Sequence, residues 1–378
     1  MTENNRVAVA HCDSYALPAI DRALEGLLIS LGPVEKWIQP GQRVAVKPNL
    51  IAKKKPEEAA TTHPLLVEAV VRMVQRADGK PFIVDSPGGP SSKGLLNAVY
   101  RTTGMSEVAA RTGCDLCLDT TELVLAHPRG RVIKQLTVLK VLAEADVIIG
   151  LPKLKTHCMT RYTGAVKLMY GAIPGLKKAE YHFNLQRLED FTQLLIDINT
   201  LLKPTLVIMD AIVGMEGDGP TAGTPRKAGL LLASPNPYAL DYVGSGFIGI
   251  HPESLPLIRL AMEQGLCPPP EQLELAGDPL PTLTSPFQLP GHRQIDFDIP
   301  GPLKRVIGRL QPKPIFSPEL CLGCGECQRC CPAGAITMAD GQPRLNLNQC
   351  IRCFCCQELC PHKAVRVRQN WLGKKLLR

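Results

Sequence analysis

The sequence has few aromatic residues and no long apolar run, and these shortages exclude several classes of protein. Phe, Trp and Tyr make up only 4% of the 378 residues, although the hydrophobic fraction of 45% and the charged fraction of 21% are ordinary for a globular protein. No segment approaches the roughly eighteen uncharged apolar residues of a membrane span, and the first residues carry neither an apolar signal region nor a twin arginine. We therefore expect a cytoplasmic globular protein with no membrane span.

Several catalytic motifs are also missing. The chain has no phosphate-binding loop of the form G-x-x-x-x-G-K-[ST], no H-E-x-x-H zinc motif and no G-x-S-x-G nucleophile motif. Nucleotide hydrolysis, zinc peptidase and serine hydrolase functions are therefore without support.

Positive charge and cysteine are concentrated near the C-terminus. Residues 301–378 hold 13 Lys or Arg against 4 Asp or Glu, together with 10 of the 15 cysteines, whereas the first 300 residues are nearly neutral. A basic segment rich in thiolates favours charge compensation of an anionic metal centre. Nucleic-acid binding is disfavoured, because the basic residues are interleaved with cysteine rather than with stacking aromatics.

The C-terminal cysteines form two runs that repeat after 29 residues. Each run has the spacing C-x2-C-x2-C-x3-C-P of bacterial ferredoxins, in which three close cysteines bind one cluster and the fourth binds the other. The sequence therefore predicts two [4Fe–4S] clusters. The first is assigned to Cys321, Cys324, Cys327 and Cys360, and the second to Cys350, Cys353, Cys356 and Cys331.

Three alternatives fit the cysteine runs less well. Structural zinc uses paired rather than triple runs, disulfides are rare in the cytosol, and a degenerate repeat would not keep all eight positions filled. Cys330 and Cys355 fall outside the register of the runs, and we expect them to be buried thiols beside a cluster.

Proline composition divides the chain into domains. Between Pro268 and Pro318 the chain places 12 of its 34 prolines, which predicts an extended surface connector over 268–314 rather than regular structure. We expect an α/β domain over 1–267, a small α+β ferredoxin-like domain over 315–370 and a basic tail, 371–378, that frays.

Before the connector, short apolar runs alternate with segments of helical period, which is typical of an α/β domain with a mostly parallel sheet. Thr62 is the expected N-cap of the second helix. The expected strands are 6–10, 43–47, 81–85, 146–150, 205–209 and 229–233, and the expected helices are 19–31, 64–76, 93–103, 188–202 and 238–246.

Polar or glycine-rich residues follow four of these strands, beginning at Lys47, Asp85, Gly150 and Asp210. Ligands of open α/β sheets bind outside the carboxyl ends of strands, so we expect the four segments to converge on one crevice. There, lysines would bind an anionic group, a histidine would donate a proton, and acidic residues would orient the lysines or a cation. The catalytic candidates are Lys153, Lys155 and His157, and the substrate-binding candidates are Lys47, Asn49, Asp85, Lys167, Asp210 and Glu216. Solvated lysines and turn-capping aspartates remain the simpler alternative.

Four segments carry a resemblance to a known family. They are KPNL at 47–50, PKLKTH at 152–157, TGAVK at 163–167 and GMEGDGP at 214–220. They resemble the domain-of-unknown-function 362 family, whose members often carry a C-terminal two-cluster ferredoxin domain. The resemblance covers about residues 5–260 and 315–370, and it implies this architecture and iron–sulfur binding but no particular reaction. Leu168 stands where the family pattern continues with Asn, which weakens any role for Lys167.

Two functions follow from these patterns. The first is an oxidoreductase whose clusters pass electrons, one at a time, to or from an anionic substrate at the strand ends. The second is an electron-transfer protein whose α/β domain docks a partner enzyme and performs no chemistry. A concave pocket near a cluster would favour the first, and a flat face the second. A third and weaker hypothesis is acyl or phosphoryl transfer by the large domain, with the clusters as redox sensors. The first two hypotheses also imply a redox partner protein.

Overall fold

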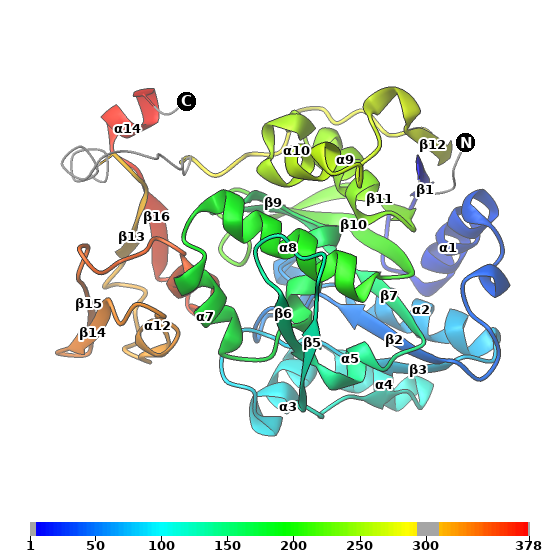
Figure 1. The fold of residues 1–378 in the computed structure, drawn as a ribbon, viewed down its shortest axis with the longest axis horizontal. Coiled ribbons are helices and arrows are strands. Elements are labelled where there is room, and N and C mark those ends of the chain that lie inside the picture. Colours follow the sequence, from blue (N-terminus) through cyan, green and yellow to red (C-terminus); the bar gives the residue numbers. More distant parts are fainter. Residues whose placement is uncertain (1–4, 293–309, 377–378) are drawn as a thin grey trace.

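The structure is a computed structural model that describes residues 5–292 and 310–376, and it contains a large α/β domain and a small cysteine-rich domain (Figure 1). The large domain is built on one ten-stranded sheet, in the order β12-β1-β11-β10-β7-β2-β3-β4, with β8 and β9 joined at β10. The strands are β1 (Arg6–His11), β2 (Arg43–Pro48), β3 (Lys80–Ile83), β4 (Asp115–Leu116), β7 (Val147–Leu151), β8 (Lys153–His157), β9 (Arg161–Thr163), β10 (Leu206–Glu216), β11 (Thr224–Ser234) and β12 (Glu274–Gly277).

Most neighbouring strands run parallel, as the sequence predicts. The pairs from β10 through β7, β2 and β3 to β4 are all parallel, whereas β11 is antiparallel to both β1 and β10. The carboxyl ends of the parallel strands therefore meet at one edge of the sheet, where the polar segments lie.

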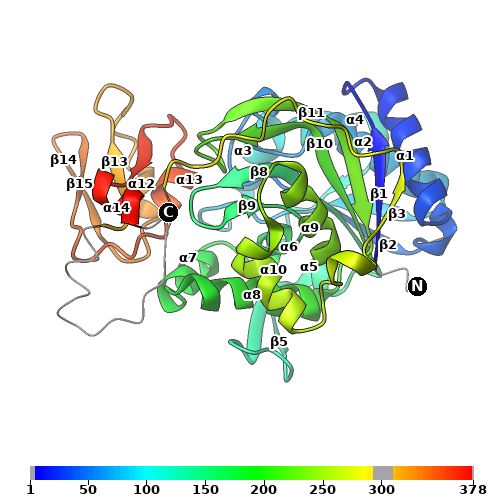
Figure 2. The ribbon, with the colours of Figure 1, turned by 90° about the horizontal axis from the view of Figure 1, so that it is seen from above.

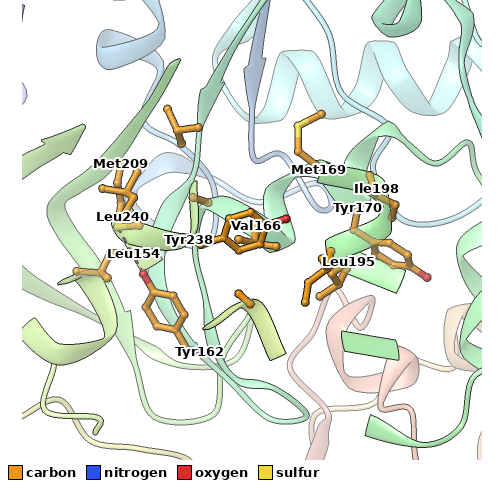
Figure 3. Close-up of a cluster of buried hydrophobic side chains, with 14 of the residues drawn as sticks. Leu154, Tyr162, Val166, Met169, Tyr170, Leu195, Ile198, Met209, Tyr238 and Leu240 are labelled. Carbon is orange, nitrogen blue, oxygen red and sulfur yellow. Dashed lines mark hydrogen bonds between the residues drawn. The ribbon is translucent and has the colours of Figure 1, made fainter. Parts of the chain in front are cut away.

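Helices cover both faces of the sheet, and alternate strand residues supply the two cores (Figures 1 and 2). Along β2, for example, Val44 and Val46 pack on one face and Ala45 on the other, as the two-residue period of a strand requires. One face carries α1 (Leu17–Leu31), α2 (Pro64–Arg76), α3 (Lys93–Thr102) and α4 (Met105–Thr112), and the other carries α8 (Leu188–Leu202), α9 (Pro237–Phe247) and α10 (Pro256–Glu263). Figure 3 shows part of the second core, where Tyr162, Tyr170 and Tyr238 pack among aliphatic side chains.

Shorter elements complete the large domain. They are the hairpin of β5 (Glu122–Ala126) and β6 (Gln135–Leu139) and the helices α5 (Lys140–Ala143), α6 (Ala165–Leu168) and α7 (Lys177–Asn184). Helix α7 lies on the side of the domain that faces the cysteine-rich domain in both views.

The structure corrects three local expectations. Residues 153–157, expected as a loop after a strand, form the buried strand β8. The N-cap of α2 is His63, whose ring accepts from the Leu65 amide, and the Thr62 hydroxyl instead donates to the Leu151 carbonyl at 2.6 Å. Strands β10 and β11 each extend to 11 residues, because their polar ends continue to pair beyond an irregularity between Ala211 and Val213.

The connector and the tail also contain regular structure. Strand β12 falls within the proline-rich stretch and pairs in parallel with β1, so this part of the connector belongs to the sheet. Residues 293–309 of the connector lie outside the described residues. The tail, expected to fray, forms helix α14 (Trp371–Leu376), and its residues 377–378 lie outside the described residues.

The cysteine-rich domain repeats its backbone as well as its sequence. It contains β13 (Lys313–Phe316) paired with β16 (Val365–Arg368), β14 (Ile336–Ala339) paired with β15 (Gln342–Leu345), α12 (Glu326–Arg329) and α13 (Cys355–Glu358). Left-handed φ angles occur at Gly323, Gly325 and Gly334 and again, 29 residues later, at Arg352, Phe354 and Lys363. The second run adopts the same turns at residues for which a left-handed φ is unfavourable, which indicates that the loop geometry is required in both halves.

Candidate functional site at the domain interface

Two lysine–aspartate pairs are buried at the carboxyl ends of the parallel strands. Lys47 of β2 lies 2.5 Å from Asp85, which follows β3, and the other oxygen of Asp85 accepts from the Leu50 amide at 2.9 Å. Gly171 packs so closely on this pair that a Cβ there would collide with both side chains. The pair is therefore enclosed by protein and fixes the relative positions of the two strand ends.

The second pair joins Lys153 to Asp210 at 2.9 Å. Tyr15 completes it, because its hydroxyl accepts from Lys153 and donates to Asp210, both at 2.8 Å, and its ring stacks on His63. Burial lowers the pKa of Lys153, although Asp210 opposes the shift. Lys153, Tyr15 and Asp210 thus bond to one another, which favours a structural role for the three side chains.

Lys155 and His157 lie on the same face of β8 as Lys153, and both are fully buried. Lys155 donates to Asn49 Oδ1 at 2.6 Å and to the Ala60 carbonyl at 2.7 Å, and burial, assisted by the charge of Lys167, lowers its pKa to about 7. These partners are neutral oxygens, so Lys155 ties β8 to the loop after β2 without an ion pair.

His157 contacts the cysteine-rich domain. Burial lowers its pKa to about 4, so the ring is neutral at pH 7. Its Nδ1 accepts from the Met159 and Thr160 amides at 3.0 and 3.3 Å, which places the ring hydrogen on Nε2. Nε2 lies 2.7 Å from a carboxylate oxygen of Glu358 in α13.

Further contacts hold α13 against the large domain. The Thr221 hydroxyl donates to the Glu358 carbonyl at 2.9 Å, and the Gln357 amide donates to the Asp218 carbonyl at 2.8 Å. Gly88 leaves room for Leu359, since a Cβ at Gly88 would collide with the leucine side chain. The strand-end segments that the sequence singles out thus bind the cysteine-rich domain directly.

A cavity of about 110 Å³ lies at this interface and has walls from both domains. A water-sized group needs about 10–15 Å³ of such volume, so the cavity has room for more than a single water. The large domain contributes Asn49, Ile51, Asp85, Ser86, Gly88, Gly89, Pro90, Lys167, Leu168, Tyr170, Gly171, Gly175, Leu176, Lys178, Ala179 and His182, and the cysteine-rich domain contributes Glu326, Arg329, Cys330, Cys355, Glu358 and Leu359.

Helix α7 supplies two polar side chains to the cavity, one turn apart. Lys178 donates to Ser86 Oγ at 2.9 Å and to the Ile173 carbonyl at 2.5 Å, and burial lowers its pKa to about 7. His182 stacks on Phe191, and burial lowers its pKa to about 4. Its buried Nδ1 has no hydrogen-bond partner within residues 5–292 and 310–376.

The cavity also contains a carboxylate and a cation that influence each other. Burial alone would raise the pKa of Glu358, but Lys167 and His157 outweigh it and hold that pKa below its ordinary value. Lys167 is half-buried and makes no ion pair within 4 Å in the described part of the chain. Its charge therefore acts on the cavity through space.

The structure distributes the predicted site residues over three places. Asn49, Asp85 and Lys167 line the cavity. Lys47, Lys153, Lys155, His157 and Asp210 lie behind its wall and are at most 1% exposed. Glu216 does not orient any of the lysines, because it pairs with Arg226 at 2.7 Å and accepts from the Gln288 amide.

Sequence reasoning missed Lys178, His182, Tyr15 and Glu358. Lys178 and His182 stand four residues apart on α7, a spacing that places both side chains on one helix face. The sequence contains that spacing, but nothing local indicates that this face shares a cavity with the cysteine-rich domain. Tyr15 and Glu358 are brought in from distant segments and carry no local signal.

The cysteine thiols of the two runs influence one another. Burial, and then the charges of Cys360, Cys321 and Cys324, raise the pKa of the Cys327 thiol. Burial, and then the charges of Cys353, Cys330, Cys350 and Cys331, raise the pKa of the Cys356 thiol. Among the described residues, no three His, Cys, Asp or Glu side chains gather around a single-ion site.

Backbone amides approach the thiols at equivalent positions of the two halves. The Ala335 amide donates to Cys331 Sγ and the Ala364 amide to Cys360 Sγ, both at 3.3 Å. Such donors stabilise thiolates and tune cluster potentials. The donor set therefore fits [4Fe–4S] clusters. Cys330 and Cys355 are buried, as predicted.

Comparison with known proteins places the chain in a family. Residues 44–246 match the model of the domain of unknown function DUF362, and residues 313–361 match a 4Fe-4S dicluster domain. The chain belongs to the DUF362 family and carries a ferredoxin-type domain that binds [4Fe–4S]. No helix of the described residues has the length and apolar character needed to cross a membrane.

One protein is similar to this chain in sequence, and two solved structures are similar to it in fold. A thylakoid-associated protein from Synechocystis sp. is 32% identical over 308 residues, which cover 79% of this chain and 92% of that protein. The lactate racemase apoprotein from Thermoanaerobacterium thermosaccharolyticum is 14% identical with a TM-score of 0.41, over 66% of this chain and 58% of that one. A Thermotoga maritima protein is 12% identical with a TM-score of 0.31, over 54% and 52% of the two chains.

Proposed function

We propose that this protein is an iron–sulfur oxidoreductase in which two [4Fe–4S] clusters exchange electrons with an anionic small molecule held in the interface cavity. The observation that carries the proposal is the shared lining of that cavity. One wall presents Lys167, Lys178 and His182, and the other presents Cys330 and Cys355, which are each adjacent in sequence to a cluster cysteine. A bound molecule would therefore lie beside the clusters.

The proposed ligand sets are the crossed ones. Cys321, Cys324, Cys327 and Cys360 would hold one cluster, and Cys350, Cys353, Cys356 and Cys331 would hold the other. The clusters supply one-electron transfer. The protein side chains bind and orient the substrate, exclude water and carry protons.

The geometry changes which lysines we assign to substrate binding. We assign substrate binding to Lys167 and Lys178 in place of Lys153 and Lys155, because the latter two are occupied with protein oxygens behind the cavity wall. Lys178 is also a better proton donor than His157. Its pKa of about 7 suits proton transfer near neutrality, whereas burial lowers the pKa of His157 to about 4 and its Nδ1 already accepts from two backbone amides.

A candidate docking surface for a redox partner lies on the cysteine-rich domain rather than on the α/β domain. Leu320 and Leu322, on either side of Cys321, are 41% and 72% exposed, and such apolar surface is typical of a transient docking face. We propose this surface as the entry point of a redox partner protein, which the oxidoreductase also requires. A cytoplasmic location remains part of the proposal.

The test is small-molecule mass spectrometry on anaerobically purified protein. The parent is expected to release an anion that Lys167→Met and Lys178→Met proteins lack, while all retain the visible absorbance of intact clusters. Lys177→Met is the matched control, because Lys177 is the neighbouring residue and pairs with Glu180 at the surface. The released anion is then added to parent protein reduced with dithionite, and reoxidation of the clusters is expected.

Two results would contradict the proposal. One is release of the same anion from the parent and both cavity variants. The other is that the released anion leaves the reduced clusters unchanged, which would favour the docking function.

A further inference from the structure

The outward face of the β13–β16 hairpin carries positive charge. In the antiparallel register of the two strands, Lys313 lies opposite Arg368 and Ile315 lies opposite Arg366. All four side chains are exposed, whereas the residue between each pair along its strand is buried, as the two-residue period of a strand requires. Three cations and one isoleucine therefore share this face, which we call the basic face.

The cations of the basic face have no carboxylate partner. None of the three forms an ion pair within 4 Å in the described part of the chain, whereas Lys363, also in this domain, pairs with Glu58 at 3.2 Å. The neighbouring sequence offers little negative charge. The last 20 residues hold six Lys or Arg and no Asp or Glu, and the single acidic residue of 310–325 is Glu319, three residues after β13 ends.

Helix α14 adds exposed apolar side chains beside the basic face. Trp371 and Leu372 are 69% and 52% exposed, and the Lys375 amine lies 5.5 Å from the centre of the Trp371 ring. The Gln369 side-chain amide donates to the Leu310 carbonyl at 2.9 Å, so the chain that enters the helix lies beside the start of β13. Figures 1 and 2 show α14 next to the hairpin. Cationic and apolar side chains therefore adjoin on one surface.

This combination of side chains is typical of protein surfaces that lie on a lipid bilayer. Trp and Leu side chains enter the headgroup region, and each Lys or Arg close to the surface is attracted by anionic lipids. Interfaces between proteins are instead depleted in lysine, and they bury their aromatic side chains in pockets of the partner. Single-stranded nucleic acids require aromatic side chains among the cations, on which the bases stack. Trp371 lies at the edge of the basic face, so the bilayer fits this surface best.

We propose that the cysteine-rich domain docks on a bilayer surface that contains anionic lipids. Lys313, Arg366 and Arg368 would lie over the headgroups, and Trp371 and Leu372 would enter the headgroup region. The binding is peripheral, because only two apolar side chains enter the bilayer. Docking of this kind does not depend on what the interface cavity binds.

Sedimentation with lipid vesicles tests the proposal on the full chain, purified anaerobically with its clusters. Vesicles of equal parts phosphatidylcholine and phosphatidylglycerol are compared with vesicles of phosphatidylcholine alone. The partition coefficient is expected to be about a hundredfold higher for the anionic vesicles, because each of three cations near the surface contributes roughly fivefold. Added salt should reduce this preference by screening. Equal binding to both kinds of vesicle, or binding to neither, would overturn the proposal.

A pair of double variants locates the binding surface. Arg366→Gln, Arg368→Gln should weaken binding to anionic vesicles by roughly 25-fold, since two cations are lost. The matched control is Arg129→Gln, Arg131→Gln, which removes two exposed arginines at the same spacing from the large domain and should bind like the parent. The visible absorbance of the clusters verifies that both variants are intact. Equal weakening in the two variants would show that net charge, rather than the basic face, directs binding, and would overturn the assignment.

Trp371 reports whether side chains enter the bilayer. The chain has two tryptophans, so Trp37→Phe leaves Trp371 as the only one. Its emission maximum is expected to shift to shorter wavelength with anionic vesicles, and Trp371→Ala should weaken binding although the charge is unchanged. Binding without a shift in emission would overturn the placement of Trp371 in the headgroup region.

A DNA duplex at the same phosphate concentration is the competing polyanion. Tighter binding of the duplex than of the anionic vesicles, unaffected by Trp371→Ala, would overturn the proposal in favour of a nucleic-acid surface. The vesicle measurements need no substrate, so their failure would leave the proposed oxidoreductase unaffected.

Discussion

Lys47 and Lys178 are both lysines at the strand-end edge of the sheet, but their partners give them different roles. Lys47 faces the carboxylate of Asp85, so its charge is compensated within the protein. Lys178 donates to a hydroxyl and two carbonyls, and in the proposed function its charge would act on a ligand. At the residue scale, the hydrogen-bond and ion-pair partners of a lysine, rather than its residue type, distinguish a lysine that links two strand ends from one proposed to bind a ligand.

Replacement of Asp85 by Ala should destabilise the protein strongly. Lys47 is fully buried, and an unpaired buried charge costs about 3–5 kcal/mol in the free energy of unfolding. Urea unfolding under anaerobic conditions measures the change. The double variant Lys47→Met, Asp85→Ala is the control, and it should recover part of the loss because it leaves no charge behind. Equal destabilisation of the single and double variants would show that the unpaired charge is not the cause.

At the scale of elements, the loop after β3 and helix α13 form the closest part of the interface. Gly88 gives Leu359 its space, while Thr221 and Gln357 add hydrogen bonds between the domains. Helix α7 borders the same region and delivers Lys178 and His182 to the cavity. These three segments, distant in sequence, line the cavity together with residues 49–51, 167–171 and 326–330, and a change in any one of them should affect the others.

Gly88→Leu should loosen α13 without unfolding either core. The added side chain collides with Leu359, and overpacking of this kind costs about 1–3 kcal/mol. Hydrogen exchange of residues 355–358 should accelerate by about tenfold or more. Gly94→Leu is the matched control, because a Cβ at Gly94 meets no atom within 4 Å and the residue is exposed. Unchanged exchange in Gly88→Leu would mean that α13 is held independently of this contact.

At the scale of the whole molecule, the proposed ligation would exchange the fourth cysteine between the two halves of the cysteine-rich domain. The neighbours of Cys327 include Cys360 from the other run, and the neighbours of Cys356 include Cys331. Each cluster held in this way would crosslink the two halves and would stabilise a small domain whose hydrophobic core is limited.

Iron analysis of double variants distinguishes crossed from uncrossed ligation. Cys327→Ala, Cys360→Ala should lose about four of eight irons, no more than either single variant, because both residues serve one cluster. Cys327→Ala, Cys331→Ala should lose iron from both clusters. The reverse pattern would establish that each run binds its own cluster with all four of its cysteines.

Much of the architecture was predictable because it depends on local periodicity and spacing. Short apolar runs such as those of β1, β2 and β7, which alternate with segments of helical period, predict a mostly parallel sheet, and the structure confirms it. The cysteine runs predict a ferredoxin-type domain, because a cluster requires thiolates at short, regular intervals. Strand β8 was not predicted, since lysines in a buried strand are stable only with partners that come from distant segments.

The sequence by itself determined the fold class, the presence of an iron–sulfur domain and the edge of the sheet at which polar residues gather. Tertiary structure alone decided which of those residues face a cavity. It placed Lys153, Lys155 and His157 behind the wall, where carboxylate, amide and carbonyl oxygens occupy them, and it placed Lys178 and His182 inside. The physical reason is that the environment of a charged side chain is the sum of contacts from segments far apart in the chain, and no local pattern encodes that sum.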